Sequence, residues 1–219
     1  MQSAVVFIGG APPHPGVLAR LPATRFVVAA DSGLDFAQAL DVSVHLLVGD
    51  LDSVSSEALA IARAAGVPVE QYPTEKDFTD AELALRAAVA RGADHLVVVS
   101  GVGDRLDHSL GALSALAHPD LAPLRVEAYW GEAHVQVMQG PTSLTLAGDP
   151  GDVVSLLALL GDAEGVTTSG LRYPLTDEPL LAGTSRGVSN EFLVRHPDVH
   201  VRHGALFVIV PHALRKPPS

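Results

Sequence analysis

The sequence predicts an α/β fold class for its first part and an all-β fold class for the remainder. Up to about residue 125, short β-branched runs alternate with alanine- and leucine-rich stretches of helical period, the pattern of βα units around a mainly parallel sheet. After residue 131 the helical period fades, and apolar runs are separated by turn sequences such as GDPGD and PLTDEP, which favours a β-sandwich. The 219 residues suffice for two packed cores. We therefore expect an α/β domain at residues 1–130 and a β-sandwich at residues 131–219.

The first of these domains should alternate strands with helices. The expected strands are apolar runs at residues 4–9, 25–31, 44–50, 67–72 and 95–101. Runs of helical period between them predict helices at residues 34–40, 56–66 and 80–92. The last two helices end on Gly66 and Gly92, and glycine readily adopts the left-handed conformation that closes a helix.

Strands alone are expected in the second domain. They are the apolar runs at residues 133–139, 142–148, 152–160, 165–170 and 203–211. No proline-rich linker or internal repeat marks the domain boundary, which we place between residues 125 and 135.

Composition and charge narrow the class of ligand. The 14 basic and 25 acidic residues give a formal charge of −11, and no segment concentrates lysine or arginine. This argues against a nucleic acid or a membrane as partner and favours small ligands. Cysteine is absent, so a metal would need oxygen or imidazole ligands, and disulfides are excluded. The first residues lack a basic leader and a membrane-length apolar run, and we expect a cytoplasmic protein.

A pair of carboxylates follows the apolar run VHLLVG. Asp50 and Asp52 would leave the carboxyl end of a buried strand, the edge of an α/β sheet where ligands usually bind. Alternate residues of an extended segment point the same way, so both carboxylates can face one Mg²⁺ ion, which prefers oxygen ligands. The alternative is that the D-x-D-S sequence is a turn that leads into the N-cap of the next helix.

A second group of charged residues lies in YPTEKDFTDAELAL. Thr79 and Glu82 have the spacing of a capping box, which would place Asp80 in the first turn of a helix. Capping leaves Lys76 and Asp77 at the same sheet edge unexplained. A phosphate site would use all three charged groups, because carboxylates hold a cation and lysine neutralises the leaving phosphate.

Two glycine-containing loops complete the expected site. In SGVGDRLDH, Gly103 lets the backbone approach a ligand, Arg105 can grip a phosphate, and Asp107 is either functional or a helix-start acid. Walker and dinucleotide-binding motifs are absent from this loop. In VVAADSGLDFA, Asp31 follows a strand and either binds a ribose hydroxyl or caps a helix, and Gly33 allows a tight turn. Charged groups at four strand ends together predict a site for a metal-bound nucleotide.

These residues resemble the thiamine pyrophosphokinase (thiamine diphosphokinase) family. The matching motifs span nearly the whole chain and are ADSG at 30–33, GDLDS at 49–53, PTEKDFTDAELAL at 73–85, GDRLDH at 103–108, TTSGLRYPL at 167–175 and GTSRGVSNEF at 183–192. The resemblance implies transfer of a diphosphate from ATP to thiamine with release of AMP. It also implies a catalytic α/β domain that binds ATP and Mg²⁺, a thiamine-binding β-sandwich, and a homodimer with thiamine near the subunit interface.

The resemblance also implies roles for individual residues. The implied Mg²⁺ ligands are Asp50, Asp52 and Asp80. The residues implied around the triphosphate and nucleotide are Lys76, Asp77, Arg105, Asp107, Asp31, Gly33 and Gly103. Near thiamine, the resemblance implies Tyr173, Ser189 and Asn190, although a Ser-Asn turn and a packed tyrosine are the alternatives for these three. Asp77 or Asp80 would accept the proton of the attacking hydroxyl.

The chain also departs from the family pattern. The first loop reads Asp31-Ser32-Gly33-Leu34-Asp35-Phe36 where the family usually has D-G-G-A-N-R, and Asp104 stands where a glycine usually precedes the arginine. Two other functions therefore stay open. Beside the thiamine diphosphokinase that the resemblance implies, the alternatives are a pyrophosphokinase for another primary alcohol, such as a hydroxymethyl pterin, and a non-catalytic sensor of nucleotide or thiamine.

Overall fold

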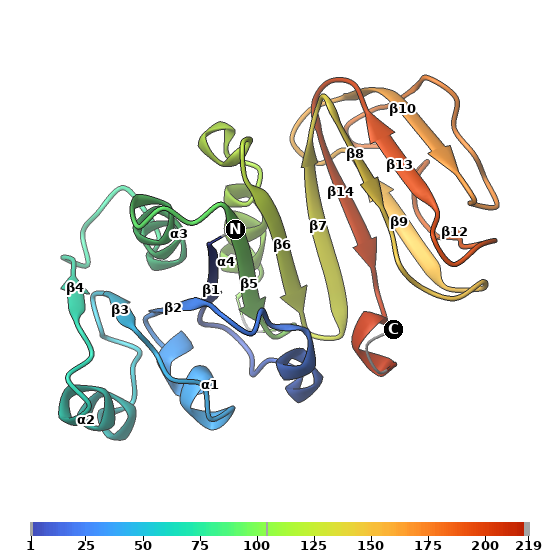
Figure 1. The fold of residues 1–219 in the computed structure, drawn as a ribbon. Coiled ribbons are helices and arrows are strands. Elements are labelled where there is room, and N and C mark those ends of the chain that lie inside the picture. Colours follow the sequence, from blue (N-terminus) through green and yellow to red (C-terminus); the bar gives the residue numbers. More distant parts are fainter. Residues whose placement is uncertain (1, 104, 217–219) are drawn as a thin grey trace. The chain divides into compact units, whose positions relative to one another are not determined.

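A computed structural model describes residues 2–103 and 105–216, and the chain divides into two compact units (Figure 1). The first unit contains the residues up to Ala115 together with Pro123–Gly131. The second contains Leu116–Ala122 and the residues from Glu132 onward. In the described part of the chain, no helix combines the length and apolarity that a membrane span requires.

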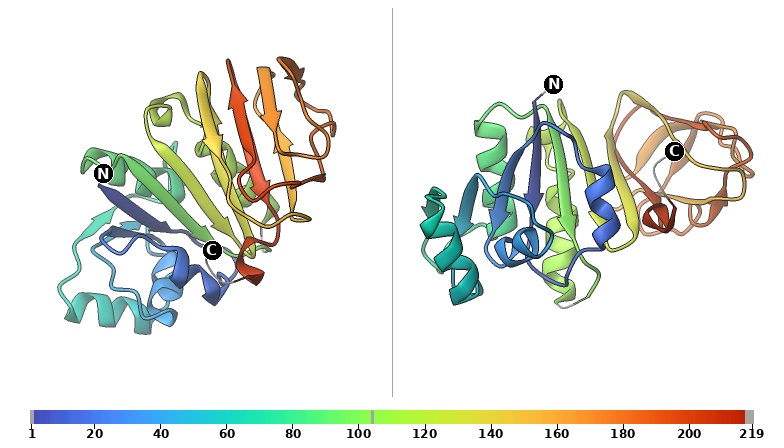
Figure 2. Two further views of the ribbon diagram at one scale, coloured as in Figure 1. Left: turned by 45° about the vertical axis from the view of Figure 1, so that its right-hand side comes forward. Right: turned by 60° about the horizontal axis from the view of Figure 1, so that its bottom comes forward.

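The first unit is built around a parallel sheet with helices packed on it (Figures 1 and 2). Its strands are β1 (Ser3–Phe7), β2 (Phe26–Ala30), β3 (Leu46–Gly49), β4 (Val69–Gln71), β5 (His95–Ser100) and β6 (Arg125–Trp130). They pair in the order β6-β5-β1-β2-β3-β4, and every pair is parallel. All residues of β5 are buried, which explains why its sequence is a continuous apolar run.

The helices of this unit begin and end where local chemistry predicts. They are α1 (Gly33–Ala39), α2 (Ser56–Ala64), α3 (Asp80–Ala90) and α4 (Leu106–Ala115), with a 3-10 helix η1 (Pro15–Arg20). Gly66 and Gly92 follow α2 and α3 with φ of 70° and 83°, which confirms the predicted left-handed closures. The Thr79 hydroxyl accepts a hydrogen bond from the Glu82 N–H at 3.2 Å, as the capping box requires.

The second unit contains two antiparallel sheets. Its strands are β7 (Ala133–Gln139), β8 (Thr142–Thr145), β9 (Val153–Leu157), β10 (Ala163–Ser169), β11 (Glu178–Leu180), β12 (Asn190–Glu191), β13 (Asp198–Val201) and β14 (Ala205–Val210). They pair as β12-β9-β14-β7 and as β11-β10-β13-β8. The expected strands did not include β11, β12 or β13. Because β11 and β12 have three and two residues, they are too short to show an alternating pattern. Two 3-10 helices, η2 (Pro119–Leu121) and η3 (Ala213–Arg215), also belong to this unit.

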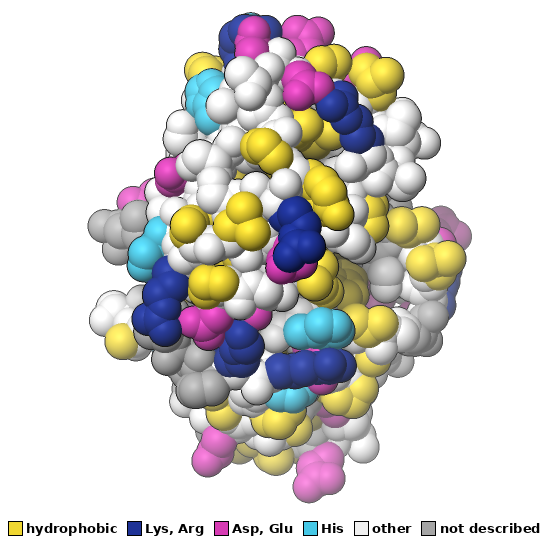
Figure 3. Space-filling model, turned by 90° about the vertical axis from the view of Figure 1, so that its right-hand side faces the viewer, with side chains coloured by type: hydrophobic (Ala, Val, Ile, Leu, Met, Phe, Trp, Pro, Cys, Tyr) yellow, Lys and Arg dark blue, Asp and Glu magenta, His cyan; other side chains and the backbone are white. Residues whose placement is uncertain are grey.

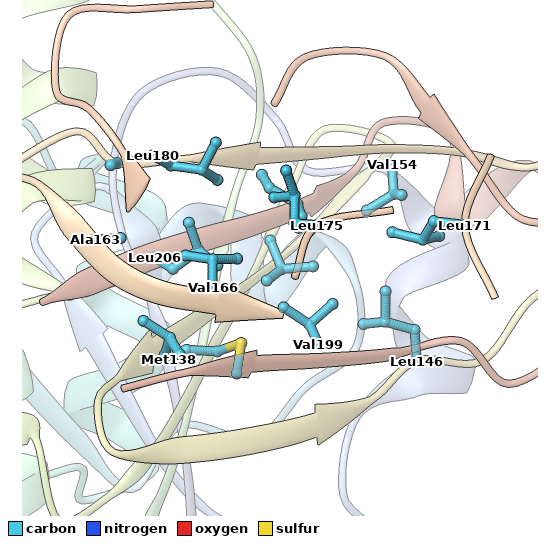
Figure 4. Close-up of a cluster of buried hydrophobic side chains, with 14 of the residues drawn as sticks. Met138, Leu146, Val154, Ala163, Val166, Leu171, Leu175, Leu180, Val199 and Leu206 are labelled. Atoms are coloured by element: carbon cyan, nitrogen blue, oxygen red, sulfur yellow. The ribbon is translucent and has the colours of Figure 1, made fainter. Parts of the chain in front are cut away.

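Both sheets of the second unit contribute to one hydrophobic core. Met138 and Leu206 come from one sheet, Val166 and Val199 come from the other, and their side chains lie in the same cluster (Figure 4). Burial on one face explains the alternation of apolar and polar residues along strands of this unit, as in β13. The expected fold class, α/β followed by all-β, is confirmed.

Candidate active site

Three carboxylates converge at the carboxyl ends of β2 and β3. Asp31 follows β2, while Asp50 and Asp52 follow β3. One ligand oxygen from each of the three lies within 4.8 Å of the other two. The Asp31 N–H donates to the Val48 carbonyl at 2.9 Å and so ties the two strand ends together. The Asp50–Asp52 pair therefore acquires a third carboxylate from the neighbouring strand.

Gly49 provides the space in which these carboxylates meet. Its φ is 146°, a conformation that side-chain-bearing residues rarely adopt. A Cβ atom at this position would lie 3.3 Å from the Asp31 Cβ and 3.3 Å from the Asp80 carboxyl carbon. The glycine thus allows Asp80, in the first turn of α3, to lie beside the three carboxylates of the strand ends.

Lys76 is the cation that the structure places among these acids. Its ammonium lies 3.1 Å from Asp50 Oδ2 and 3.0 Å from Asp80 Oδ1, and its side chain is 12% exposed. Burial alone would lower the pKa of Lys76, but the hydrogen bonds and charges of Asp80 and Asp50 outweigh it and raise the pKa. Burial likewise tends to raise the pKa of Asp50, but the Asp52 N–H and Lys76 hold it below its ordinary value.

Asp31 is the strained member of the cluster. Burial raises its pKa, a hydrogen bond from Ser53 opposes the rise, and the charges of Asp80, Asp50 and Asp52 add to it. Its Oδ1 atom is buried without a hydrogen-bond partner among the described residues. Asp31 also has a φ of 49°. A group of hard oxygen donors that includes an unpartnered buried oxygen fits a divalent cation such as Mg²⁺.

The N-cap that the alternative expected after the D-x-D-S turn is present, but it does not use the two aspartates. Ser55, not Ser53, is the N-cap of α2, and its hydroxyl accepts from the Ala58 N–H at 3.1 Å. The Ser53 hydroxyl instead donates to Asp31 Oδ2. Helix capping therefore leaves Asp50, Asp52 and Ser53 free for the carboxylate cluster. Sequence reasoning missed Ser53 as a site residue, although its place in GDLDS was a signal that could have found it.

The other candidates of the first unit show varied environments. Asp77 is exposed beside Lys76. Arg105 and Asp107 form an exposed ion pair with 2.6 Å between Nη2 and Oδ2, and the Arg105 hydrogen bond lowers the pKa of Asp107 to about 2. Both side chains are more than half exposed, so a phosphate can reach the guanidinium. Asp104 lies outside the described residues.

The two candidate glycines differ in their surroundings. A Cβ atom on Gly33 would lie only 2.2 Å from the Phe7 carbonyl oxygen, so close packing of α1 on the end of β1 explains this glycine. Gly103 has a φ of 128°, and a Cβ there would meet only the Ala11 Cβ, at 3.6 Å. Its conformation rather than its packing therefore favours glycine.

The three residues expected near thiamine lie on adjacent segments of the second unit. The Tyr173 side chain is exposed, and its backbone N–H donates to Asn190 Oδ1 at 3.0 Å. Asn190 is buried, whereas Ser189 is exposed with a φ of 59°. The Ser189 N–H donates to the Ser155 hydroxyl at 3.1 Å. The structure thus brings Tyr173 and Asn190 together.

The fold and the acidic cluster define a class of protein, an α/β enzyme of the phosphotransferase type. Carboxylates and a partly buried lysine meet at the carboxyl edge of a parallel sheet, the place where such folds bind nucleotides.

Comparisons with known proteins identify the family. The model of the thiamin pyrophosphokinase catalytic domain matches residues 19–127, and that of the thiamin pyrophosphokinase vitamin B1 binding domain matches residues 137–206. These matches cover more than half of the chain, which therefore belongs to the thiamin pyrophosphokinase family. The expected resemblance is confirmed, and the family implies ATP and thiamine as substrates.

Individual relatives agree with the family assignment. The curated thiamine pyrophosphokinase of Bacillus subtilis (strain 168) is 25% identical over 162 residues, which make up 74% of this chain and 75% of that protein. The crystal structure of the Bacillus subtilis enzyme shares the fold with a TM-score of 0.82 at 22% identity, covering 95% of this chain and 98% of that one. The thiamin pyrophosphokinase of Geobacillus thermodenitrificans gives a TM-score of 0.77 at 25% identity, covering 95% and 96%.

Proposed function

We propose that this protein transfers a diphosphate group from ATP to the hydroxyethyl oxygen of thiamine and releases AMP. The observation that supports the proposal most strongly is the convergence of Asp31, Asp50 and Asp52 around a shared position, with Lys76 beside Asp50. This is the arrangement that a metal-bound polyphosphate needs, and it lies within the residues that match the family's catalytic domain.

We propose Mg²⁺ as the cofactor, with Asp50, Asp52 and Asp31 as the residues that would hold it. When bound there, the ion would neutralise charge on the polyphosphate. Asp80 was expected as a ligand and Asp31 as a nucleotide-side acid. We now propose Asp31 as the third ligand, because one of its oxygens lies within 4.8 Å of oxygens of both Asp50 and Asp52. Asp31 Oδ1 and Asp80 Oδ1 are both buried without a hydrogen-bond partner among the described residues, but Asp80 Oδ1 already lies 3.0 Å from the Lys76 ammonium.

Lys76 and Arg105 would neutralise the negative charge that develops on the phosphates as AMP departs. Thiamine's hydroxyl attacks the β-phosphorus in line with the departing AMP, and no covalent intermediate with the protein is needed. The raised pKa of Lys76 keeps this side chain protonated, so it neutralises charge and does not act as a base. Arg105 supplies a second, more exposed cation. The proposed acceptor of the hydroxyl proton is Asp80 or Asp77.

We propose that the two parts of the chain bind different substrates. Residues 1–130 would carry ATP and Mg²⁺, and residues 131–219 would bind thiamine through the segments that contain Tyr173 and Ser189. The cytoplasmic location expected from the cysteine-free composition also remains a proposal.

We also propose that the protein is a homodimer. The second unit exposes large apolar side chains that would favour association, including Val188, Leu193 and Val194, each more than 40% exposed. Figure 3 shows one face of the molecule on which hydrophobic side chains lie among charged ones. Light scattering that gives the mass of a monomer at assay concentrations would contradict this proposal.

The experiment that tests the function is an assay of AMP release from ATP and Mg²⁺ with thiamine present or omitted. Thiamine-dependent AMP, with thiamine diphosphate identified by mass, is the expected result. If a hydroxymethyl pterin supported AMP release and thiamine did not, the acceptor would be wrong. If the folded protein bound ATP or thiamine without releasing AMP, it would be a sensor.

A further inference from the structure

Asn190 lies between two motif segments of the second unit that are far apart in the sequence. An isolated antiparallel bridge joins Leu171 to Phe192. Next to it, the Arg172 N–H donates to the Glu191 carbonyl at 2.9 Å. These backbone contacts hold the segment at residues 170–172 against the segment that follows β12.

At the next residue, Tyr173, the backbone pairs with the side chain of Asn190 and not with another backbone segment. Its Oδ1 atom accepts from the Tyr173 N–H at 3.0 Å, and its Nδ2 atom donates to the Tyr173 carbonyl at 2.7 Å. The carboxamide therefore offers Tyr173 one donor and one acceptor, as a neighbouring strand would. Oδ1 also accepts from the Glu191 N–H at 2.9 Å, so both of its lone pairs are used.

The base of this arrangement is held in place and buried. Asn190 belongs to β12 and pairs with Val154 of β9, and the preceding Ser189 N–H donates to the Ser155 hydroxyl at 3.1 Å. Asn190 is only 6% exposed, whereas Tyr173 is 64% exposed. The buried Asn190 side chain thus fixes the backbone of Tyr173, while the Tyr173 side chain stays exposed.

We infer that Asn190 is a positioning residue that acts on the substrate through Tyr173 and does not contact thiamine itself. The inference rests on the proposed function, in which the Tyr173 segment binds thiamine. An exposed aromatic ring with a fixed backbone suits thiamine, because the thiazolium ring is cationic and attracted to an aromatic face. This role differs from the direct contact that the family resemblance implied for Asn190.

The chemistry of the carboxamide defines the variants. Asn190→Asp keeps the shape but removes the Nδ2 donor and places a carboxylate against the Tyr173 carbonyl. Gln139→Glu is the matched control, since it makes the same amide-to-acid change where Nε2 donates to the His118 carbonyl in an exposed setting. We expect Asn190→Asp to raise the KM for thiamine by about tenfold or more, and to leave the KM for ATP within about twofold. Gln139→Glu should change neither.

A double variant separates positioning from contact. If Asn190 acts through Tyr173, adding Asn190→Asp to Tyr173→Ala should raise the KM for thiamine by less than about twofold beyond the effect of Tyr173→Ala alone. Full multiplication of the two single effects would overturn the inference, because it would mean that the two residues act on thiamine independently.

The wild-type protein permits a measurement that needs neither turnover nor a variant. Asn190 is the only asparagine in the sequence, so labelling with ¹⁵N-asparagine gives one carboxamide signal in a nuclear magnetic resonance spectrum. We expect one carboxamide proton to exchange with solvent at least about tenfold more slowly than in a free asparagine side chain. Exchange at the free rate would overturn the inference, even if Asn190→Asp failed to fold. A protein without thiamine-dependent AMP release but with the slow proton would instead refute the proposed function while retaining the link between Asn190 and Tyr173.

Discussion

The two edges of the parallel sheet in the first unit differ in how well their ionisable side chains are partnered. At the amino edge, His95 Nε2 lies 2.8 Å from Glu127 Oε1 and His95 Nδ1 lies 3.1 Å from the Ser3 hydroxyl. Arg125 Nη2 donates to the second Glu127 oxygen at 3.1 Å. Both ring nitrogens and both carboxylate oxygens therefore have partners, although His95 and Glu127 are buried.

At the carboxyl edge, carboxylates instead outnumber the basic groups beside them. The carboxylates of Asp31, Asp50, Asp52 and Asp80 lie at this edge, and Lys76 forms ion pairs with Asp50 and Asp80. Asp31 Oδ1 and Asp80 Oδ1 are both buried without a hydrogen-bond partner among the described residues. Positive φ values at Asp31 and Leu51 add backbone strain. We therefore expect the amino edge to stabilise the fold, and the unpaired acids of the carboxyl edge to serve the proposed binding of a ligand at some cost in stability.

The largest effect should follow from Asp52→Asn. The substitution keeps the shape of the side chain but removes a charge from the proposed cation site. We expect kcat to fall by about 10³-fold while the melting temperature stays within a few degrees. AMP release and calorimetry measure the two quantities. Glu57→Gln, an exposed acid-to-amide change on α2, is the control. Near-normal turnover of Asp52→Asn with Mg²⁺ would show that this carboxylate is not a metal ligand.

The amino edge should respond in the opposite way. His95→Ala leaves the buried Glu127 without its imidazole partner, and we expect a loss of about 3 kcal/mol in the free energy of unfolding with kcat unchanged within about twofold. Denaturant unfolding gives the first value. His200→Ala, which removes an exposed histidine of β13, is the control. A large loss of kcat in folded His95→Ala protein would contradict the claim that the amino edge serves stability and not catalysis.

A smaller effect on rate is expected from Ser53. Ser53→Ala removes the hydroxyl that orients Asp31, and we expect kcat to fall by about tenfold with a higher Mg²⁺ requirement. Ser53→Thr retains a hydroxyl and should restore most of the activity. If the alanine and threonine variants were equally impaired, the side-chain volume and not the hydrogen bond would be responsible.

The smallest expected effect is a gain in stability from Asp31→Asn. Burial raises the pKa of Asp31, so its charge costs stability above that pKa, and the cost disappears as the pH falls through it. The variant should melt higher than wild type near neutral pH, and the gain should shrink in acid; calorimetry at both pH values measures it.

The ionised carboxylate of Asp50 should have the opposite effect on stability. Its lowered pKa contributes stability above the unfolded pKa, and that stability is lost as the pH falls through the folded pKa. Asp50→Asn should therefore melt below wild type at neutral pH. A fall in melting temperature for Asp31→Asn equal to that for Asp50→Asn would remove the distinction between the two carboxylates.

Much of this arrangement could be predicted from local sequence signals. The left-handed glycines at Gly66 and Gly92, the cap at Thr79 and the strand-end position of Asp50 and Asp52 all depend on residues close in the chain. The fold class followed from the change of period near residue 131, because burial of one face or both faces leaves a pattern in every strand.

The rest depended on contacts between segments that are distant in the sequence. The sequence predicted that Asp31, Asp50 and Asp52 lie at one sheet edge, but it assigned Asp31 to the nucleotide. That Asp31 comes within 4.8 Å of both other carboxylates depends on the pairing of β2 with β3 and on the φ of 49° at Asp31. The roles of Ser53 and Asn190 are hydrogen bonds to residues 22 and 17 positions away. The motif resemblance identified the segments, but it could not distinguish a residue that contacts the substrate from one that positions another residue.

The most direct test of the account is the melting temperature of wild-type protein and Asp52→Asn in about 10 mM MgCl₂, compared with NaCl of equal ionic strength. A cation that binds the carboxyl edge should stabilise the folded wild-type protein by mass action, with a rise of several degrees that Asp52→Asn lacks. An equal rise in both proteins, or none in wild type, would contradict the claim that this edge is strained in order to hold a divalent cation.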